Sequence, residues 1–78
     1  MLKPITVKIC GCEVINHPAI TESTIIETIR NTLYNITDVN ILYKEKCVVI
    51  EMWECSEDNL SALQFLKEVL WADYIILD

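Results

Sequence analysis

The sequence is poor in the residues that several common catalytic sites require. Its 78 residues include one glycine, two prolines and one histidine. A single glycine excludes the phosphate-binding loop and the dinucleotide-binding fingerprint, because each needs several glycines at fixed spacing. The one histidine, His17, has no serine and aspartate context that would indicate a catalytic triad. We therefore predict that the chain is not an enzyme.

Basic residues are also scarce. Six lysines and arginines stand against twelve aspartates and glutamates, which gives a net charge of −6. Nonspecific binding to nucleic acid or to an anionic membrane needs a cationic surface, so both are disfavoured. The aromatic set with basic neighbours that RNA-binding sheets carry is missing as well. The predicted partners are proteins, basic ones included, with no direct nucleic acid binding and no membrane association.

The sequence has no long apolar run. Its first ten residues, MLKPITVKIC, lack the apolar segment and the cleavage site of a signal peptide. No run reaches the roughly 18 residues of a transmembrane helix. These features predict a cytoplasmic protein, whose four cysteines are expected to be free thiols in that reducing compartment. The length predicts one domain over residues 1–78.

Apolar residues are abundant, at 53% of the chain, and two segments show them in strand-like alternation. In residues 5–14 one face of the predicted strand carries Ile5, Val7, Ile9 and Gly11, while the other carries Thr6, Lys8, Cys10 and Cys12. In residues 47–55 the first face carries Val48, Ile50 and Met52, while the second carries Cys47, Val49, Glu51, Trp53 and Cys55. Each segment is therefore expected to bury one face.

Two other segments show helical spacing. Residues 21–36 repeat isoleucine and leucine every three or four positions, and either Thr21 or a capping box of Thr24 and Glu27 could begin that helix. Ser56 is expected to cap a second helix with acidic residues in its first turn. Residues 37–45 and 73–78 predict two further strands. The apolar stripe of the second helix contains Leu60, Leu63, Leu66 and Leu70, widened by Ala62, Phe65 and Val69.

The predicted order of elements is β-α-β-β-α-β. It predicts an α+β, ferredoxin-like fold, with a four-stranded antiparallel sheet in the order 4-1-3-2 and both helices on one face. The chain resembles heavy-metal-associated and ACT domains, and the segment NTLYNITDVNILYKEKCVVIEMWECSEDNLSALQFLKEVLWADYIIL resembles the later two-thirds of a heavy-metal domain. That family carries C-x-x-C after its first strand, whereas Cys10-Gly11-Cys12 has one intervening residue.

This topology places the first and third strands side by side, so that three cysteines are expected to cluster on the open face of the sheet. One allowed register sets Cys10 opposite Cys47 and Lys8 opposite Val49. The next sets Cys12 opposite Cys47 and Lys8 opposite Glu51, and we prefer it because it pairs opposite charges. The thiols of Cys10, Cys12 and Cys47, with His17, could bind zinc or copper(I). The competing interpretation makes them small apolar residues in a strand, with Gly11 allowing close packing of the helices.

The open face is also a candidate interface, formed by Lys8, Val49, Glu51 and Trp53. Val49 and Trp53 beside the thiols make it more apolar than a solvated sheet face requires, and tryptophan is a favoured interface anchor. Trp71 is expected to plug the core against the last strand. The apolar surplus suggests a homodimer or another protein partner. Three functions therefore stay open, of which the first is a non-catalytic interaction or regulatory module. The others are soft-metal or thiol-redox chemistry and a phage-type acidic inhibitor of a nucleic-acid enzyme.

Overall fold

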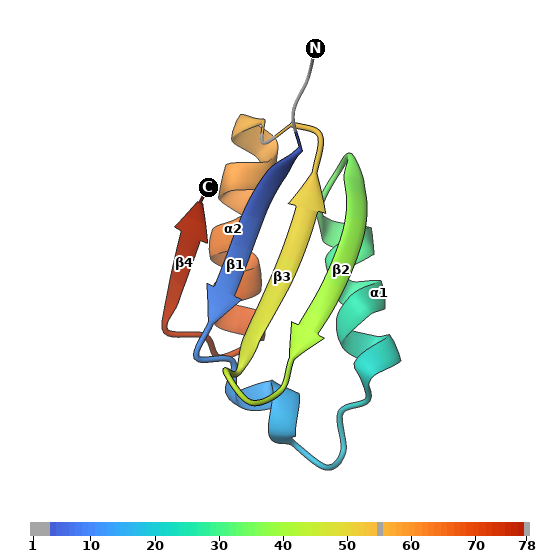
Figure 1. Cartoon of the computed structure of the whole chain (residues 1–78), viewed down its shortest axis with the longest axis vertical. Coiled ribbons are helices and arrows are strands. Elements are labelled where there is room, and N and C mark those ends of the chain that lie inside the picture. The colour runs from blue at the N-terminus through green and yellow to red at the C-terminus, as the bar shows by residue number, and fades with distance from the viewer. Residues whose placement is uncertain (1–3, 55, 78) are drawn as a thin grey trace.

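The computed structural model describes residues 4–54 and 56–77, and it has the predicted order of strands and helices (Figure 1). A short 3₁₀ helix, η1, is the one addition to that order. No helix in these residues is long and apolar enough to cross a membrane. The elements are β1 (Ile5–Cys10), η1 (Glu13–Asn16), α1 (Glu22–Thr32), β2 (Ile36–Leu42), β3 (Cys47–Met52), α2 (Glu57–Val69) and β4 (Tyr74–Leu77).

The four strands form one antiparallel sheet in the order β2-β3-β1-β4. Read from its other edge, this is the predicted order 4-1-3-2, so the α+β class and the strand order are confirmed. Figure 1 shows α1 and α2 behind the sheet, with α2 behind β1 and β4 and α1 toward β2. The opposite face of the sheet carries no helix, and we call it the open face.

The core lies between the sheet and the helices, and it contains the alternating residues predicted to face inward. Val7 and Ile9 of β1 and Val48, Ile50 and Met52 of β3 are fully buried. Burial of these side chains is the main favourable term in folding, at roughly 25 cal/mol per Å² of apolar surface. On α2 the predicted stripe is buried at Leu63, Leu66 and Leu70, whereas Leu60 is 41% exposed.

The first strand is shorter than predicted, because the chain turns at Gly11. β1 ends at Cys10, and Gly11 has φ +76°, a left-handed conformation that glycine adopts without steric cost. A Cβ at this position would also collide with the side chain of Asp73. The expectation that Gly11 faces the helices from within the strand is therefore wrong. Glycine is required here by the turn and by the close approach of Asp73.

The structure has both predicted helix caps, and it selects Thr21 over Thr24 as the cap of α1. The Thr24 N–H donates to Thr21 Oγ1 at 3.3 Å, so Thr21 is the cap of α1 and Thr24 lies inside the helix. The Asn59 N–H donates to Ser56 Oγ at 3.2 Å, which confirms Ser56 as the cap of α2. Each cap satisfies one of the free N–H groups of a first helical turn.

Trp71 does not plug the core, and that prediction is wrong. Its side chain is 64% exposed and its backbone has φ +53°. The Ala72 N–H donates to the Lys67 carbonyl at 2.9 Å and the Trp71 N–H to the Glu68 carbonyl at 3.2 Å, which closes α2 in a Schellman motif. Trp71 holds the left-handed position that glycine usually takes, and this geometry points the side chain away from the core.

Asn59 is the one buried polar residue among the described positions, and it joins two loops. Its side chain accepts from the Tyr34 N–H and donates to the Tyr34 carbonyl, both at 2.9 Å, and it also donates to the Glu54 carbonyl at 3.4 Å. The loop after α1 is thus fastened to the loop before α2. Buried polar groups that lose their partners cost more than an average hydrogen bond contributes.

We expect Asn59→Ala to lower the free energy of unfolding by about 2–3 kcal/mol, because both backbone groups of Tyr34 lose their partner. Urea unfolding followed by tryptophan fluorescence measures the change. Asn40→Ala is the control, since Asn40 is exposed and its side chain donates to the nearby Asp38 carboxylate at 3.0 Å, with no link between loops. Equal stability of the two variants would contradict a clamping role for Asn59.

Candidate functional site on the open face of the sheet

The open face consists of the strand side chains that point away from the helices, and register places them in three cross-strand rows. The first row lies at the end of the sheet where β1 stops, the second crosses the middle, and the third lies toward the start of β1. From β2 to the far strand, the rows are Leu42, Cys47, Cys10 and Tyr74; then Asn40, Val49, Lys8 and Ile76; then Asp38, Glu51 and Thr6.

Cys10 and Cys47 form a disulfide at the centre of the first row. Their Cα atoms are 4.1 Å apart and their separation in sequence is 37 residues. The expectation of free thiols is therefore wrong for this pair. The register is Cys10 opposite Cys47 and Lys8 opposite Val49, so the preferred register, with Cys12 opposite Cys47 and Lys8 opposite Glu51, is wrong too.

Cys12 lies in the core and not on the open face. The turn at Gly11 takes Cys12 out of the strand alternation, so its side chain joins the core cluster with no exposed surface. Its thiol donates to the Ile9 carbonyl at 3.2 Å. The predicted cluster of three thiols on the open face is thus wrong, and the structure brings together only Cys10 and Cys47.

Burial raises the pKa of the Cys12 thiol from 9.0 to about 11, and the nearby Asp73 carboxylate adds to the rise. The thiol therefore stays protonated over the physiological range, which makes it a poor nucleophile and a poor metal ligand. In the unfolded chain this thiol ionises at lower pH. Its contribution to stability is consequently lost as the pH rises from about 9 toward 11.

The other predicted ligand, His17, lies on an exposed loop. Its Nδ1 accepts a hydrogen bond from the Ala19 N–H at 3.1 Å, which is a local turn contact. Within residues 4–54 and 56–77, no group of three or more histidines, cysteines, aspartates or glutamates is placed to hold a metal ion. Cys55, predicted for the far end of the third strand, lies outside the described residues.

Three of the four predicted interface residues occupy the second and third rows. Lys8 and Val49 lie opposite each other and are half-buried, and Glu51 lies opposite Thr6. Trp53 follows the end of β3 and is 49% exposed. The sequence did not identify the open-face residues of the outer strands β2 and β4, because it gave no register for the pairing of these strands with β3 and β1. Among these residues, Leu42, Tyr74 and Ile76 are exposed large apolar side chains.

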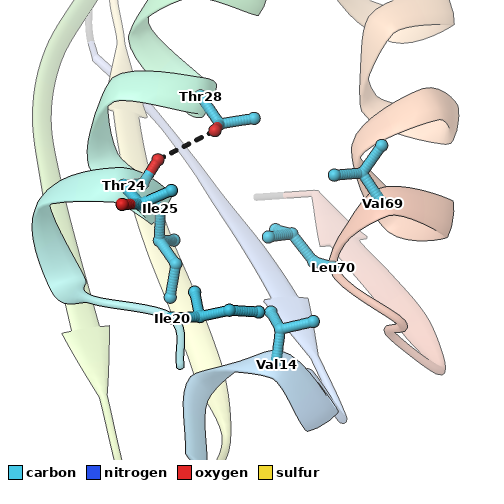
Figure 2. A pocket seen from close by; sticks show the side chains of 7 residues that line it. All are labelled: Val14, Ile20, Thr24, Ile25, Thr28, Val69 and Leu70. Carbon is cyan, nitrogen blue, oxygen red and sulfur yellow. Dashed lines mark hydrogen bonds between the residues drawn. The ribbon is translucent and has the colours of Figure 1, made fainter. Parts of the chain in front are cut away.

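An apolar hollow lies on the other side of the molecule, between α1 and α2 (Figure 2). Its volume of about 110 Å³ is small beside the roughly 300–1,000 Å³ of small-molecule sites. The Thr28 hydroxyl in its wall donates to the Thr24 carbonyl at 2.8 Å, so it is already bonded. The hollow thus offers no catalytic set. Its lining residues are Val14, Ile20, Thr24, Ile25, Thr28, Val69 and Leu70.

The Cys10–Cys47 disulfide should stabilise the fold by restricting the unfolded chain. For a separation of 37 residues, chain entropy predicts a contribution of about 4 kcal/mol. We expect the variant with Cys10→Ala and Cys47→Ala, or the wild type in a phosphine reductant, to unfold at a clearly lower urea concentration. The reductant should leave the double variant unchanged. An identical midpoint with and without reductant in the wild type would contradict a stabilising disulfide.

Comparison with protein-family models, with curated proteins and with solved structures found no match to this chain. None of the three comparisons therefore indicates a substrate, a partner or a functional residue. The candidate site stands on the chemistry and placement of its own residues, with the Cys10–Cys47 disulfide in its first row.

Proposed function

We propose that this chain is a small, acidic, non-catalytic interaction module that binds a protein partner through the open face of its sheet. The observation that carries this proposal is the group of exposed apolar side chains in the first two rows, which lie around Lys8. The disulfide lies between Leu42 and Tyr74, with Val49 and Ile76 in the adjoining row. We further propose that the β-α-β-β-α-β order belongs to the ferredoxin-like fold.

The composition of this face supports binding. Antiparallel sheets that face water on one side usually carry polar side chains there. Here Leu42, Tyr74 and Ile76 are 37%, 53% and 40% exposed, and tyrosine is among the residues that contribute most to the binding energy of interfaces. The disulfide joins the two central strands directly beneath this surface, so little conformational entropy would be lost when a partner binds.

Charge supports a protein as the partner. The net charge of −6 disfavours nucleic acid and anionic membranes, while Lys8 at the centre of the face suits a partner carboxylate. The partner is a second copy of this chain or a different protein. A regulatory role belongs to the same proposal. So does a cytoplasmic location, which requires the Cys10–Cys47 disulfide to persist in a reducing compartment or to form there only transiently.

The proposal predicts that Val49→Glu weakens binding. The new carboxylate would lie opposite Lys8, which preserves the fold, but it would place a charge in the apolar surface. The photo-crosslinking residue p-benzoylphenylalanine at position 51 should capture the partner in the cells that naturally produce the protein. We expect a covalent adduct of defined mass that Val49→Glu reduces at least several-fold.

Leu60→Glu is the matched control for this experiment. It adds the same charge on α2, where Leu60 is 41% exposed, and it should leave the adduct unchanged. Loss of the adduct in both variants would assign the effect to net charge. Absence of an adduct from the chain that carries p-benzoylphenylalanine at position 51 and no other change would refute binding through this face.

A second candidate, thiol-redox chemistry, is favoured by the disulfide itself. In this function an external dithiol would reduce the Cys10–Cys47 bond. The external dithiol would itself be oxidised to a disulfide, and Cys10 and Cys47 would become two thiols. The residues Cys10 and Cys47 are 3% and 8% exposed, which limits the access of another thiol. Cys12 is excluded as the resolving thiol by its position in the core and its pKa of about 11.

A redox titration in glutathione and dithiothreitol buffers tests this candidate. A midpoint potential above about −300 mV is expected for a regulatory disulfide, and a lower value for a purely structural one. Iodoacetamide at pH 8 should label the Cys10 and Cys47 peptides after reduction. The Cys12 peptide should react much more slowly because its thiol remains protonated. A potential well below that limit would remove the redox candidate and leave the interaction module intact.

A further inference from the structure

The two edges of the sheet differ in how well they are protected against pairing. β2 carries a bulge between Ile36 and Asp38, and its open-face side chains include Asp38 and Asn40. Bulges and polar side chains of this kind discourage further strand pairing. β4 has no bulge, pairs with β1 along its other side, and consists entirely of Tyr74, Ile75, Ile76 and Leu77. An edge strand of this composition is a ready template for another strand.

The disulfide geometry identifies the backbone groups of β4 that point outward. A Cα separation of 4.1 Å marks Cys10 and Cys47 as a non-hydrogen-bonded pair of the antiparallel ladder. The backbone of Cys10 must then face β4, and the Asp73 N–H indeed donates to the Cys10 carbonyl at 2.8 Å.

The same alternation continues along β4. Cys10 lies opposite Tyr74 and Lys8 lies opposite Ile76. Because the backbone of Cys10 faces β4 and the two kinds of pair alternate, these two are the expected hydrogen-bonded pairs of the β1–β4 ladder. The intervening residues Ile75 and Leu77 therefore direct their N–H and C=O groups away from the sheet. These outward groups are the ones that an added strand would engage.

We propose that β4 pairs antiparallel with β4 of a second copy, about a twofold axis centred on Ile75. This register sets Ile75 opposite Ile75 of the second copy, so that two N–H···O=C bonds form at the axis. It also sets Tyr74 opposite Ile76 of the second copy, and the reverse, on the open face. The two sheets become one sheet of eight strands. Each copy contributes the same strand to the interface, as in an isologous dimer.

A second copy fits this edge because the strand is complementary to itself. Tyr74 and Ile76, which are 53% and 40% exposed, would cover each other twice across the axis, as aromatic and β-branched side chains do in stable cross-strand pairs. The inference deepens and rests on the proposed function, since pairing joins two open faces into one continuous surface. It does not require Val49 or Glu51, which lie on β3.

Charge gives the dimer a characteristic salt dependence. Each copy carries a net charge of −6, and added salt screens the repulsion between them, with a Debye length of about 10 Å at 0.1 M. Dimerisation should therefore strengthen as the salt concentration rises. A complex with a basic protein would weaken under the same conditions. The direction of the salt effect therefore distinguishes a second copy of this chain from a basic partner protein.

Light scattering on the full chain, made by chemical synthesis, tests the proposal. We expect the mass of two 9.0 kDa chains at about 100 μM and in about 0.5 M salt, and a smaller dimer fraction at about 20 mM salt. N-methylation of Ile75 removes one outward N–H and keeps the side chain, and it should yield a monomer. N-methylation of Ile41 is the matched control, because the register directs the Ile41 N–H outward from β2, and the dimer should persist.

Hydrogen exchange of the unmodified chain supplies a second readout. The Ile75 amide should become protected as the protein concentration rises, whereas the Ile76 amide should be protected at every concentration by its bond to β1. A monomer at about 100 μM in high salt, an Ile75 amide that stays unprotected, or equal loss of the dimer in both methylated chains would overturn the proposal. Adduct formation at position 51 would be unaffected by that result, so the failure of this inference and of the proposed function are distinguishable.

Discussion

The rest of the structure depends on the pairing of β1 with β3, the two central strands of the sheet. Their register aligns Val7 with Ile50 and Ile9 with Val48 on the core side, and it aligns Cys10 with Cys47 on the other side. A shift of one residue would turn all of these side chains to the opposite face. Burial of one face therefore excludes every odd shift of the register, and the Cys10–Cys47 disulfide distinguishes between the registers that remain.

That pairing also determines what lies at the two ends of the open face. The chain must leave β1 directly after Cys10, and Gly11 makes this turn against Asp73. Cys12 consequently enters the core, and β4 begins beside Cys10 with Tyr74 on the open face. The disulfide, the exposed side chains of Leu42 and Tyr74 and the start of β4 therefore lie together at the end of the sheet where β1 stops.

The pattern of apolar residues predicted the element order, the inward faces of β1 and β3 and the cap at Ser56, because these depend on local periodicity and local hydrogen bonds. It failed for Trp71, whose direction is set by the left-handed end of α2. It failed for Cys12 for a similar reason, since alternation was extended through a glycine that ends the strand. Both failures lie at turns, where one backbone angle redirects the side chain.

The sequence by itself determined the class of the fold, the acidic charge and the lack of common catalytic motifs, because composition and periodicity carry that information directly. Only the tertiary structure decided which cysteines meet, since two registers were equally consistent with the alternation of the strands. It also decided that Leu42, Tyr74 and Ile76 share a surface with the disulfide. Such proximity depends on strand order and register, and residues more than thirty positions apart acquire it only when the sheet forms.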